Sequence, residues 1–328
     1  MPVIPLVGIH GAQLAAIDIE KALKSRSLMV NSQLHALDLY GYDGVISFMD
    51  LTLEAEALGC RILYRRDTVP SVAEALFQDI NDYDRIEVTR IEESERVEEF
   101  IRAAELMKEN IDGSKTAVGA YITGPFTLAG QLMGMETLFE NMILHPESFE
   151  QVLKKTGEVT GVMGEKYKKL GLDLVIVLDP MASPDLISPR HFRTMVKPFI
   201  KRVVQMMNPP HALIVLHICG DTTSILPDMI DCGIDALSID SKVDIAHAAH
   251  LCAADVGLIG NIDPVNLLLK GSRKDVDEAS RQCIEASSEA TYFILSSGCE
   301  VPKDTPAENI TEMVRVARTY TKTHEKCE

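Results

Sequence analysis

Short apolar runs alternate with longer stretches of helical periodicity along most of this chain. A short continuous apolar run bounded by turn residues predicts a buried strand, whereas apolar residues at every third or fourth position predict an amphipathic helix. The runs that predict strands are residues 3–7, 44–48, 117–122, 174–178, 213–217, 236–239, 256–259 and 292–295. Helical periodicity marks residues 29–40, 94–108, 146–170, 189–207, 276–288 and 307–321.

This alternation of strand and helix predicts an α/β protein with a parallel sheet. It favours a (β/α)₈ TIM barrel, a single domain over residues 1–328, with the active site at the C-terminal ends of the strands. A doubly wound sheet is the alternative, but no G-x-G-x-x-G motif follows the first predicted strand. Residues 53–93 are longer than one connection needs, so we expect them to form an excursion over the mouth of the barrel.

Composition narrows the classes of function that remain. The formal net charge is −17, which disfavours binding to nucleic acid or to an anionic membrane surface. The chain has seven cysteines, an odd and scattered set that is untypical of a secreted disulfide scaffold. The first residues lack a basic stretch followed by an apolar run, and no apolar run is long enough to span a membrane. We therefore expect a cytoplasmic protein with reduced thiols.

Polar side chains follow the predicted strands, where a barrel would bring them to one mouth. In chain order they are His10, Asp50, Thr123, Asp179, His217, Cys219, Asp240, Asn261, Asp263 and Cys299. Polar residues are common where strands end, but two thiols and an imidazole among them point to metal chemistry.

His217, Cys219 and Cys299 are the candidate metal ligands. His217 and Cys219 stand two positions apart, so on an extended strand both side chains point the same way. Cys299 comes 80 positions after Cys219 (299 minus 219), which leads from the fifth predicted strand to the eighth. One imidazole and two thiolates select Zn²⁺, and three protein ligands leave a fourth site open. Asp240 is the candidate fourth ligand, although it could equally cap a helix.

The other candidates have competing structural roles. The three metal-ligand candidates themselves could instead be core residues. Asp50, Asp179 and His10 are the candidate catalytic residues, with an N-cap as the alternative for Asp50. We expect Asn261 and Asp263 to hold a turn. Residues expected to serve packing or structure alone are Met133, Met135, Cys60, Cys232, Cys252, Cys283 and Cys327.

Over nearly its whole length the sequence resembles the uroporphyrinogen decarboxylase superfamily, and in particular its zinc methyltransferase branch. That branch contains the methylcobamide:coenzyme M methyltransferases and the methyltransferase components of bacterial O-demethylases. The resemblance lies in the H-x-C motif at His217 and Cys219 with the later Cys299, and in the segments SFMDLTLEAEALG, ITGPFTLAG, GNIDPVNLL and GCEVPKDTPAENI. The decarboxylases carry arginines near the N-terminus where PLVGIHGAQLAA has none, and Gly-His-Gly where this chain has Gly298, Cys299 and Glu300. The resemblance therefore implies methyl transfer and not decarboxylation.

The activity implied is a zinc-dependent exchange of a methyl group between a small substrate and the cobalt of a corrinoid. A separate corrinoid protein would supply the cofactor, since the chain shows no cobalamin-binding module. The segment from HICGDTT to SIDSKVD favours the O-demethylase subgroup, with a methyl ether as donor, over transfer to a thiol such as coenzyme M. A zinc hydrolase and a non-catalytic zinc-binding barrel are the alternatives from other classes.

Overall fold

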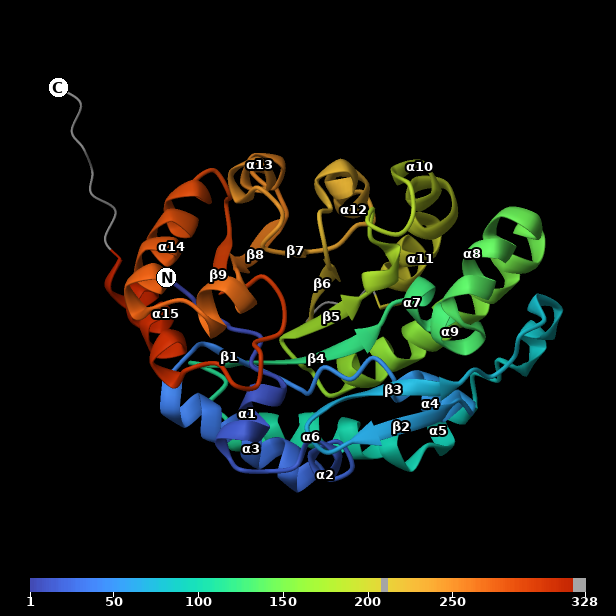
Figure 1. Ribbon diagram of the computed structural model, residues 1–328, viewed down its shortest axis with the longest axis horizontal. Helices are drawn as coiled ribbons and strands as arrows, with labels where there is room; N and C mark the ends of the chain where they lie inside the picture. Colours follow the sequence, from blue (N-terminus) through green and yellow to red (C-terminus); the bar gives the residue numbers. More distant parts are fainter. Residues whose placement is uncertain (208–211, 321–328) are drawn as a thin grey trace.

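Seven parallel strands form the central sheet of the protein (Figure 1). The computed structural model describes residues 1–207 and 212–320. The strands are β1 (Gly44–Ile46), β4 (Ala117–Thr123), β5 (Leu174–Leu178), β6 (Leu213–Ile218), β7 (Ala236–Ile239), β8 (Gly257–Ile262) and β9 (Phe293–Ser297). Their order in the sheet follows their order in the sequence. A doubly wound sheet reverses its strand order at a switch point, so that alternative is excluded.

The first predicted strand, residues 3–7, differs from the prediction. Within it only Val3 forms a bridge, with Leu295 of β9. The amide of Ile4 donates to the carbonyl of Leu295 at 2.9 Å, and the amide of Asp43 donates to the carbonyl of Val3 at 2.9 Å. Pro2 and Pro5 have no N–H, which prevents a continuous ladder. The segment nevertheless bonds to both edges of the sheet, at β9 and just before β1.

The sheet curls around an apolar interior. On β5 alternate residues face inward, and Leu174, Ile176 and Leu178 belong to one buried cluster while Val175 and Val177 belong to another. Ile4, Ile46 and Ile259, from opposite parts of the sheet, also belong to the inner cluster. The predicted α/β class with a curled parallel sheet is confirmed.

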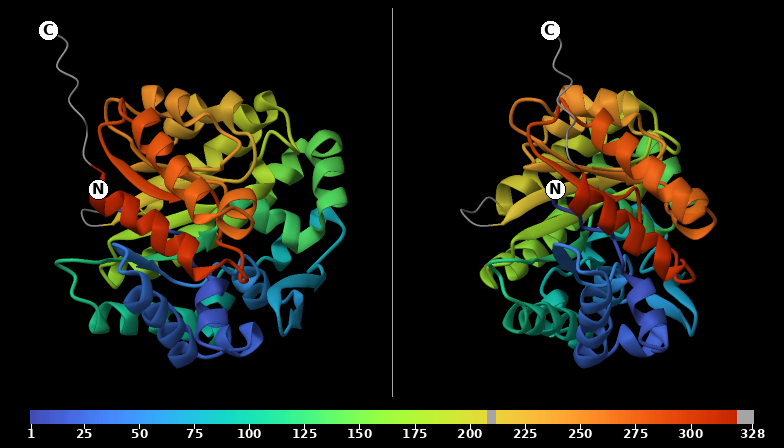
Figure 2. Two further views of the ribbon diagram at one scale, coloured as in Figure 1. Left: turned by 60° about the vertical axis from the view of Figure 1, so that its left-hand side comes forward. Right: turned by 90° about the vertical axis from the view of Figure 1, so that its left-hand side faces the viewer.

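Helices cover the outer face of the sheet, as Figures 1 and 2 show. The α-helices are α1 (Ile9–Leu14), α2 (Ile19–Ala22), α3 (Arg26–Tyr40), α4 (Leu53–Leu58), α5 (Arg90–Glu93), α6 (Glu95–Asn110), α7 (Pro125–Met133), α8 (Met135–Leu144), α9 (Pro146–Lys169), α10 (Pro189–His191), α11 (Lys197–Met207), α12 (Leu226–Ile230), α13 (Ile245–Leu251), α14 (Arg273–Ala286) and α15 (Ala307–Thr319). Short 3₁₀ turns span Ile80–Arg85, Pro180–Ala182 and Thr223–Ile225, and π turns span Phe192–Val196 and Pro264–Leu269.

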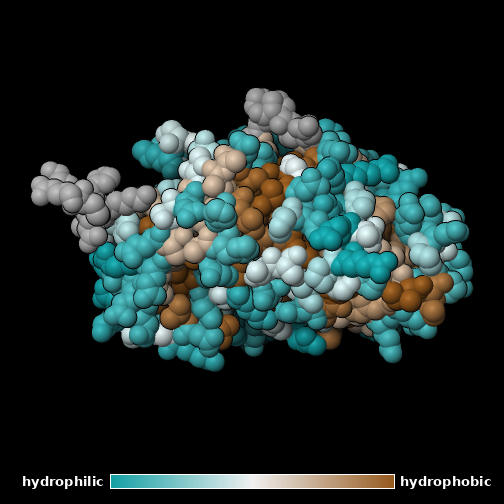
Figure 3. Space-filling model, turned by 90° about the horizontal axis from the view of Figure 1, so that it is seen from above, coloured by the Kyte–Doolittle hydropathy of each residue, from teal (hydrophilic) through white to brown (hydrophobic). Residues whose placement is uncertain are grey.

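The predicted helices are present, with changes at their ends. The helix expected over residues 189–207 is divided into α10, a π turn and α11. Helix α15 ends at Thr319, and residue 321, the predicted end, lies outside the described residues. In the described part of the chain no helix is long and apolar enough to cross a membrane. The face seen from above in Figure 3 is mostly hydrophilic, with apolar side chains in separate strips.

The predicted excursion over residues 53–93 contains a β-hairpin, β2 (Arg61–Arg65) with β3 (Thr68–Glu74), which pair antiparallel. In Figure 1 strands β4 and β5 point toward the side of the molecule where this hairpin lies. Residues of β3 line a cavity together with Cys219 and Cys299, which follow β6 and β9. The excursion therefore covers the C-terminal end of the sheet, as predicted.

Candidate metal centre

Three candidate ligands converge at the C-terminal end of the sheet. The Sγ atom of Cys219 lies 3.3 Å from Nε2 of His217 and 3.8 Å from Sγ of Cys299. Two ligands bound tetrahedrally to one zinc, at about 2.0–2.3 Å each, stand roughly 3.5–3.8 Å apart. Within the described residues no other group of three His, Cys, Asp or Glu side chains comes as close together. The three residues expected from the sequence thus lie close enough together to share one zinc ion.

The imidazole of His217 is held with Nε2 toward the thiols. Its Nδ1 lies 3.1 Å from the carbonyl oxygen and 3.0 Å from Oγ of Ser238. The parallel register of β6 and β7 pairs these two residues directly. An Nδ1–H that donates to Ser238 leaves the lone pair of Nε2 free for a metal. Sequence reasoning missed Ser238, because only the strand register brings it to His217.

The two thiols at this site differ from the other described cysteines. The pKa of Cys299 is lowered to about 4, chiefly because Cys219 hydrogen-bonds to its thiolate, with a further contribution from His217. The same bond raises the pKa of Cys219. Elsewhere burial raises the thiol pKa to about 11 or 12, at Cys60, Cys232, Cys252 and Cys283. Metal binding needs a thiolate, so Cys299, whose thiolate is stabilised by Cys219 and His217, is distinct from these buried thiols. Cys327 lies outside the described residues.

Asp240 occupies a position other than that of the expected fourth ligand. Its Oδ2 accepts from the amide of Gly220 at 2.9 Å, and its Oδ1 accepts from the amide of Lys242 at 3.0 Å. Gly220 directly follows Cys219 and has a φ of +89°, a conformation that favours glycine. Asp240 is not part of the ligand cluster. Its carboxylate instead fixes the turn that carries Cys219, a structural role that differs from the helix cap considered from the sequence, since Asp244 caps α13.

Asp50 lies in the wall of the cavity and in a buried ion pair. Its Oδ1 accepts from the amide of Thr52 at 2.8 Å and from the Thr52 hydroxyl at 2.7 Å, at the start of α4. Its Oδ2 pairs with Arg96 of α6. Asp50 is not the N-cap of α4, which is Thr52; one of its oxygens holds the turn before that helix, and the residue also lines the cavity.

Asp179 and His10 are not members of the ligand cluster, although the amide of Asp179 donates to the carbonyl of His217 at 3.0 Å. Asp179 is fully buried and accepts from the amide and the hydroxyl of Thr127, each at 2.7 Å, in the first turn of α7. Burial raises its pKa to about 6. His10 contacts the carbonyl of Lys303 at 2.9 Å and the hydroxyl of Tyr40 at 2.7 Å. Neither Asp179 nor His10 lines the cavity. A catalytic role for either residue therefore stays a prediction from the sequence.

The turn and packing residues mostly follow expectation. Asn261 donates to the carbonyls of Asp240 and Val243, and Asp263 accepts from the amides of Val265 and Asn266, so both hold turns. Met133 is buried in the core. Met135 is 48% exposed and lines the cavity, contrary to its expected packing role, because it begins α8 just after the break at Gly134.

A cavity of about 700 Å³ opens beside the two thiols. Its walls come from hairpin strand β3, from the residues after β1, and from the junction of α7 and α8. Glu300, next to Cys299, lines it, and burial raises the pKa of this carboxyl to about 8. Gln131 of α7 also lines it, and its Oε1 is buried without a hydrogen-bond partner. No local pattern pointed to Gln131, whereas the position of Glu300 beside Cys299 could have drawn attention to that residue.

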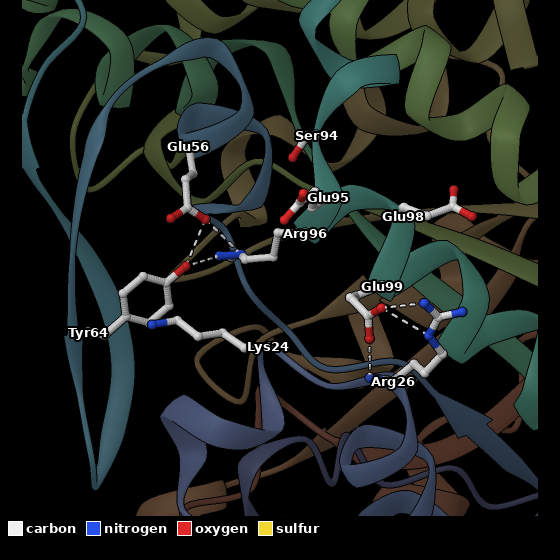
Figure 4. A pocket seen from close by; sticks show the side chains of 9 residues that line it. All are labelled: Lys24, Arg26, Glu56, Tyr64, Ser94, Glu95, Arg96, Glu98 and Glu99. Atoms are coloured by element: carbon white, nitrogen blue, oxygen red, sulfur yellow. Dashed lines mark hydrogen bonds and ion pairs between the residues drawn. The ribbon is translucent and has the colours of Figure 1, made fainter.

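A second pocket, of about 790 Å³, lies on the other side of Arg96 (Figure 4). There Nη1 of Arg96 donates to the hydroxyl of Tyr64 at 2.9 Å, and its Nε pairs with Glu56 at 2.8 Å. Arg26 and Glu99 form a separate ion pair in the same pocket. The charges lining this pocket are largely paired with one another, and it contains none of the three candidate ligands.

Comparison with known proteins identifies the family. The model of the family described as Uroporphyrinogen decarboxylase (URO-D) matches residues 1–320. The chain belongs to the uroporphyrinogen decarboxylase family. The superfamily resemblance noted in the sequence is thereby confirmed.

Relatives and solved structures indicate the branch and the fold. Methylcobamide:CoM methyltransferase MtbA of Methanosarcina mazei is 30% identical over 85% of this chain and 80% of its own length. Methylated-thiol–coenzyme M methyltransferase of the same organism is 26% identical over 91% of this chain and 78% of its own. A solved methyltransferase from Methanosarcina mazei is 24% identical, with a TM-score of 0.89 over 97% of this chain and 93% of its own. The predicted methyltransferase branch is thus supported by sequence, and the fold by structure.

Proposed function

We propose that this protein is a zinc-dependent methyltransferase that moves a methyl group between a small substrate and the cobalt of a corrinoid on a partner protein. The observation that carries the proposal is the cluster of His217, Cys219 and Cys299 beside a cavity at the C-terminal end of the sheet. The family and the methylcobamide-dependent relatives support the same reaction class. We also propose that residues 2–6, which bond to both edges of the sheet, close it into the expected barrel.

The three side chains would hold the ion through Nε2 and the two Sγ atoms. When bound, zinc supplies a Lewis acid that lowers the pKa of a thiol or polarises an ether oxygen. Ser238 fixes the orientation of the imidazole, and Asp240 fixes the turn after Cys219. A structural zinc site would have four protein ligands. Asp240 is engaged elsewhere, so a fourth position is available to a substrate.

The cavity supplies positioning and exclusion of water. Hairpin residues Val69 and Val72 form one wall, and Pro180 and Met181 form part of another. Apolar walls beside Cys219 and Cys299 restrict water near the reacting group and strengthen electrostatic interactions there. A corrinoid would have to approach through this end of the molecule, so the partner protein is expected to dock around the hairpin.

The substrate is a thiol or a methyl ether. Relatives named for coenzyme M and for methylated thiols favour a thiol. The sequence favoured a methyl ether, and none of the relatives reported above is named as an O-demethylase, so this alternative rests on the sequence resemblance alone.

Absorbance of the corrinoid tests the proposal. Zinc-loaded protein is mixed with methylcobalamin and a thiol panel, or with Co(I)-cobalamin and a methyl ether panel, with a corrinoid protein as carrier where one is in hand. We expect methyl transfer that Cys219→Ala abolishes and that the matched variant Cys252→Ala, at a buried thiol outside the cluster, preserves. Hydrolysis of a substrate without methyl transfer would favour the zinc hydrolase alternative, and zinc binding with neither activity would favour a non-catalytic barrel.

A further inference from the structure

The described residues that line the cavity include no cation. Two of them carry carboxyl groups, Asp50 and Glu300, and Cys219 and Cys299 are its other ionisable side chains. Most of the remaining wall is apolar or small, with Val72, Ala73 and Met181 as examples. A site that recognises an anion normally offers a lysine, an arginine or an array of amides to it.

The nearest cations are paired with other groups. The guanidinium of Arg96 binds Asp50, Glu56 and Tyr64, and Figure 4 shows it among the residues of the neighbouring pocket. The side chain of Arg96 is only 9% exposed. Lys242, whose charge acts on Cys219, pairs with Asp185 at 3.2 Å and does not line the cavity. A ligand anion would have to displace one of these pairs.

The cavity offers neutral polar groups instead. The Oε1 atom of Gln131 is buried without a partner, and a buried amide oxygen left without a hydrogen bond costs free energy. Because this atom is closed to solvent, the Gln131 side chain would have to rotate before a bound molecule could donate to it. The other polar side chains of the wall include the neutral hydroxyls of Thr52 and Ser71, which suit a neutral ligand and do not replace the counter-ion of a sulfonate or a carboxylate.

We infer that this site takes thiols or methyl ethers without a negative charge, and that it discriminates against anionic ones such as coenzyme M. An anion placed in this partly buried, mostly apolar cavity loses hydration, and none of the described lining residues offers a positive charge to replace it. The inference rests on the proposed methyl transfer, and it separates this chain from the relatives named for coenzyme M.

The test compares three thiols of the same chain length that differ in terminal charge. These are 2-mercaptoethanesulfonate, 2-mercaptoethanol and 2-mercaptoethylamine. Calorimetry with zinc-loaded protein measures each dissociation constant, and the corrinoid assay measures each rate. We expect the sulfonate to bind about tenfold or more weakly than the uncharged thiol, because charges within a few ångströms interact strongly when partly buried. Equal or tighter binding of the sulfonate, or failure of the two other thiols to bind, overturns the inference.

A positive charge introduced into the cavity wall provides a second test of the inference. Ser71 lies on β3 and lines the cavity, whereas Thr68 lies on the same strand and does not. Ser71→Arg should improve binding of the sulfonate relative to mercaptoethanol by about tenfold, and Thr68→Arg should leave that ratio unchanged. Equal ratios in both variants would contradict the inference. If the binding order holds but no corrinoid is methylated or demethylated, the proposed function fails and the charge selectivity stands.

Discussion

Replacement of Asp240 by alanine distinguishes two possible roles of this residue: an anchor for the turn that carries Cys219, and a metal ligand. In the folded protein this carboxylate accepts from the amides of Gly220 and Lys242, at 2.9 and 3.0 Å. Loss of a carboxylate that caps backbone amides typically costs about 1–2 kcal/mol of unfolding free energy. Groups that orient a metal ligand change affinity about 10–100-fold when removed, and Asp240 acts only through the backbone. We therefore expect a loss of zinc affinity of about tenfold, with zinc still bound at stoichiometric concentrations.

Two assays on the same variant check this expectation. Urea unfolding of the metal-free protein gives the change in unfolding free energy, and competition with a chromogenic chelator gives the zinc affinity. Asp244→Ala is the matched control, because Asp244 caps α13 by accepting from the amides of Ala246 and His247. It should show a similar loss of stability with unchanged zinc affinity. If Asp240→Ala loses zinc as completely as Cys219→Ala, or if its stability is unaltered, the assignment of Asp240 as an anchor is wrong.

Two further substitutions test buried charges next to the cavity. Burial raises the pKa of Glu54 above its usual value, so its favourable contribution is complete at low pH and is lost as pH rises through the pKa of the folded state. Glu54→Gln keeps the geometry toward the amide and hydroxyl of Thr123, and it should remove this fall in stability as the pH rises above about 4. Parallel curves of unfolding free energy against pH for the two proteins in urea unfolding would contradict this. Arg96→Ala leaves Asp50 buried without its partner and should lower the unfolding free energy by about 3 kcal/mol. Arg26→Ala, which breaks the more exposed pair with Glu99 in the same pocket, should cost less, and equal losses in thermal or urea unfolding would argue against a special role for the buried pair.

The elements that the sequence predicted best are those with strong local signals. Apolar runs such as that of β5 and the long helical period of α9 coincide with the structure within a few residues. The prediction of a strand over residues 3–7 failed because it rested on the run of apolar residues. It did not weigh the missing N–H groups of Pro2 and Pro5, which interrupt the backbone hydrogen bonds.

The residues of the candidate site also divide into those that local sequence signals predicted and those that they did not. His217, Cys219 and Cys299 could be grouped because parallel strands end at one edge, and the structure places them together. Asp50 lines the same cavity, but Asp179 and Asp240 are not in the ligand cluster, because a carboxylate after a strand has many possible donors nearby. Asp179 accepts a hydrogen bond from Thr127, and Asp240 accepts one from Gly220. Both contacts depend on how the loops fold back. Gln131 reaches the cavity from helix α7 and Arg96 reaches Asp50 from helix α6, and their positions follow from tertiary packing alone.

Zinc stoichiometry tests the central claim most directly. The chain should purify with, or take up, about one zinc per molecule. Elemental analysis after dialysis against a weak chelator should show this zinc lost in Cys219→Ala and in Cys299→Ala, and retained in Cys232→Ala and Cys252→Ala, whose buried thiols lie outside the ligand cluster. Circular dichroism should show all four variants folded. Full zinc retention in a Cys219→Ala, Cys299→Ala double variant would contradict the account.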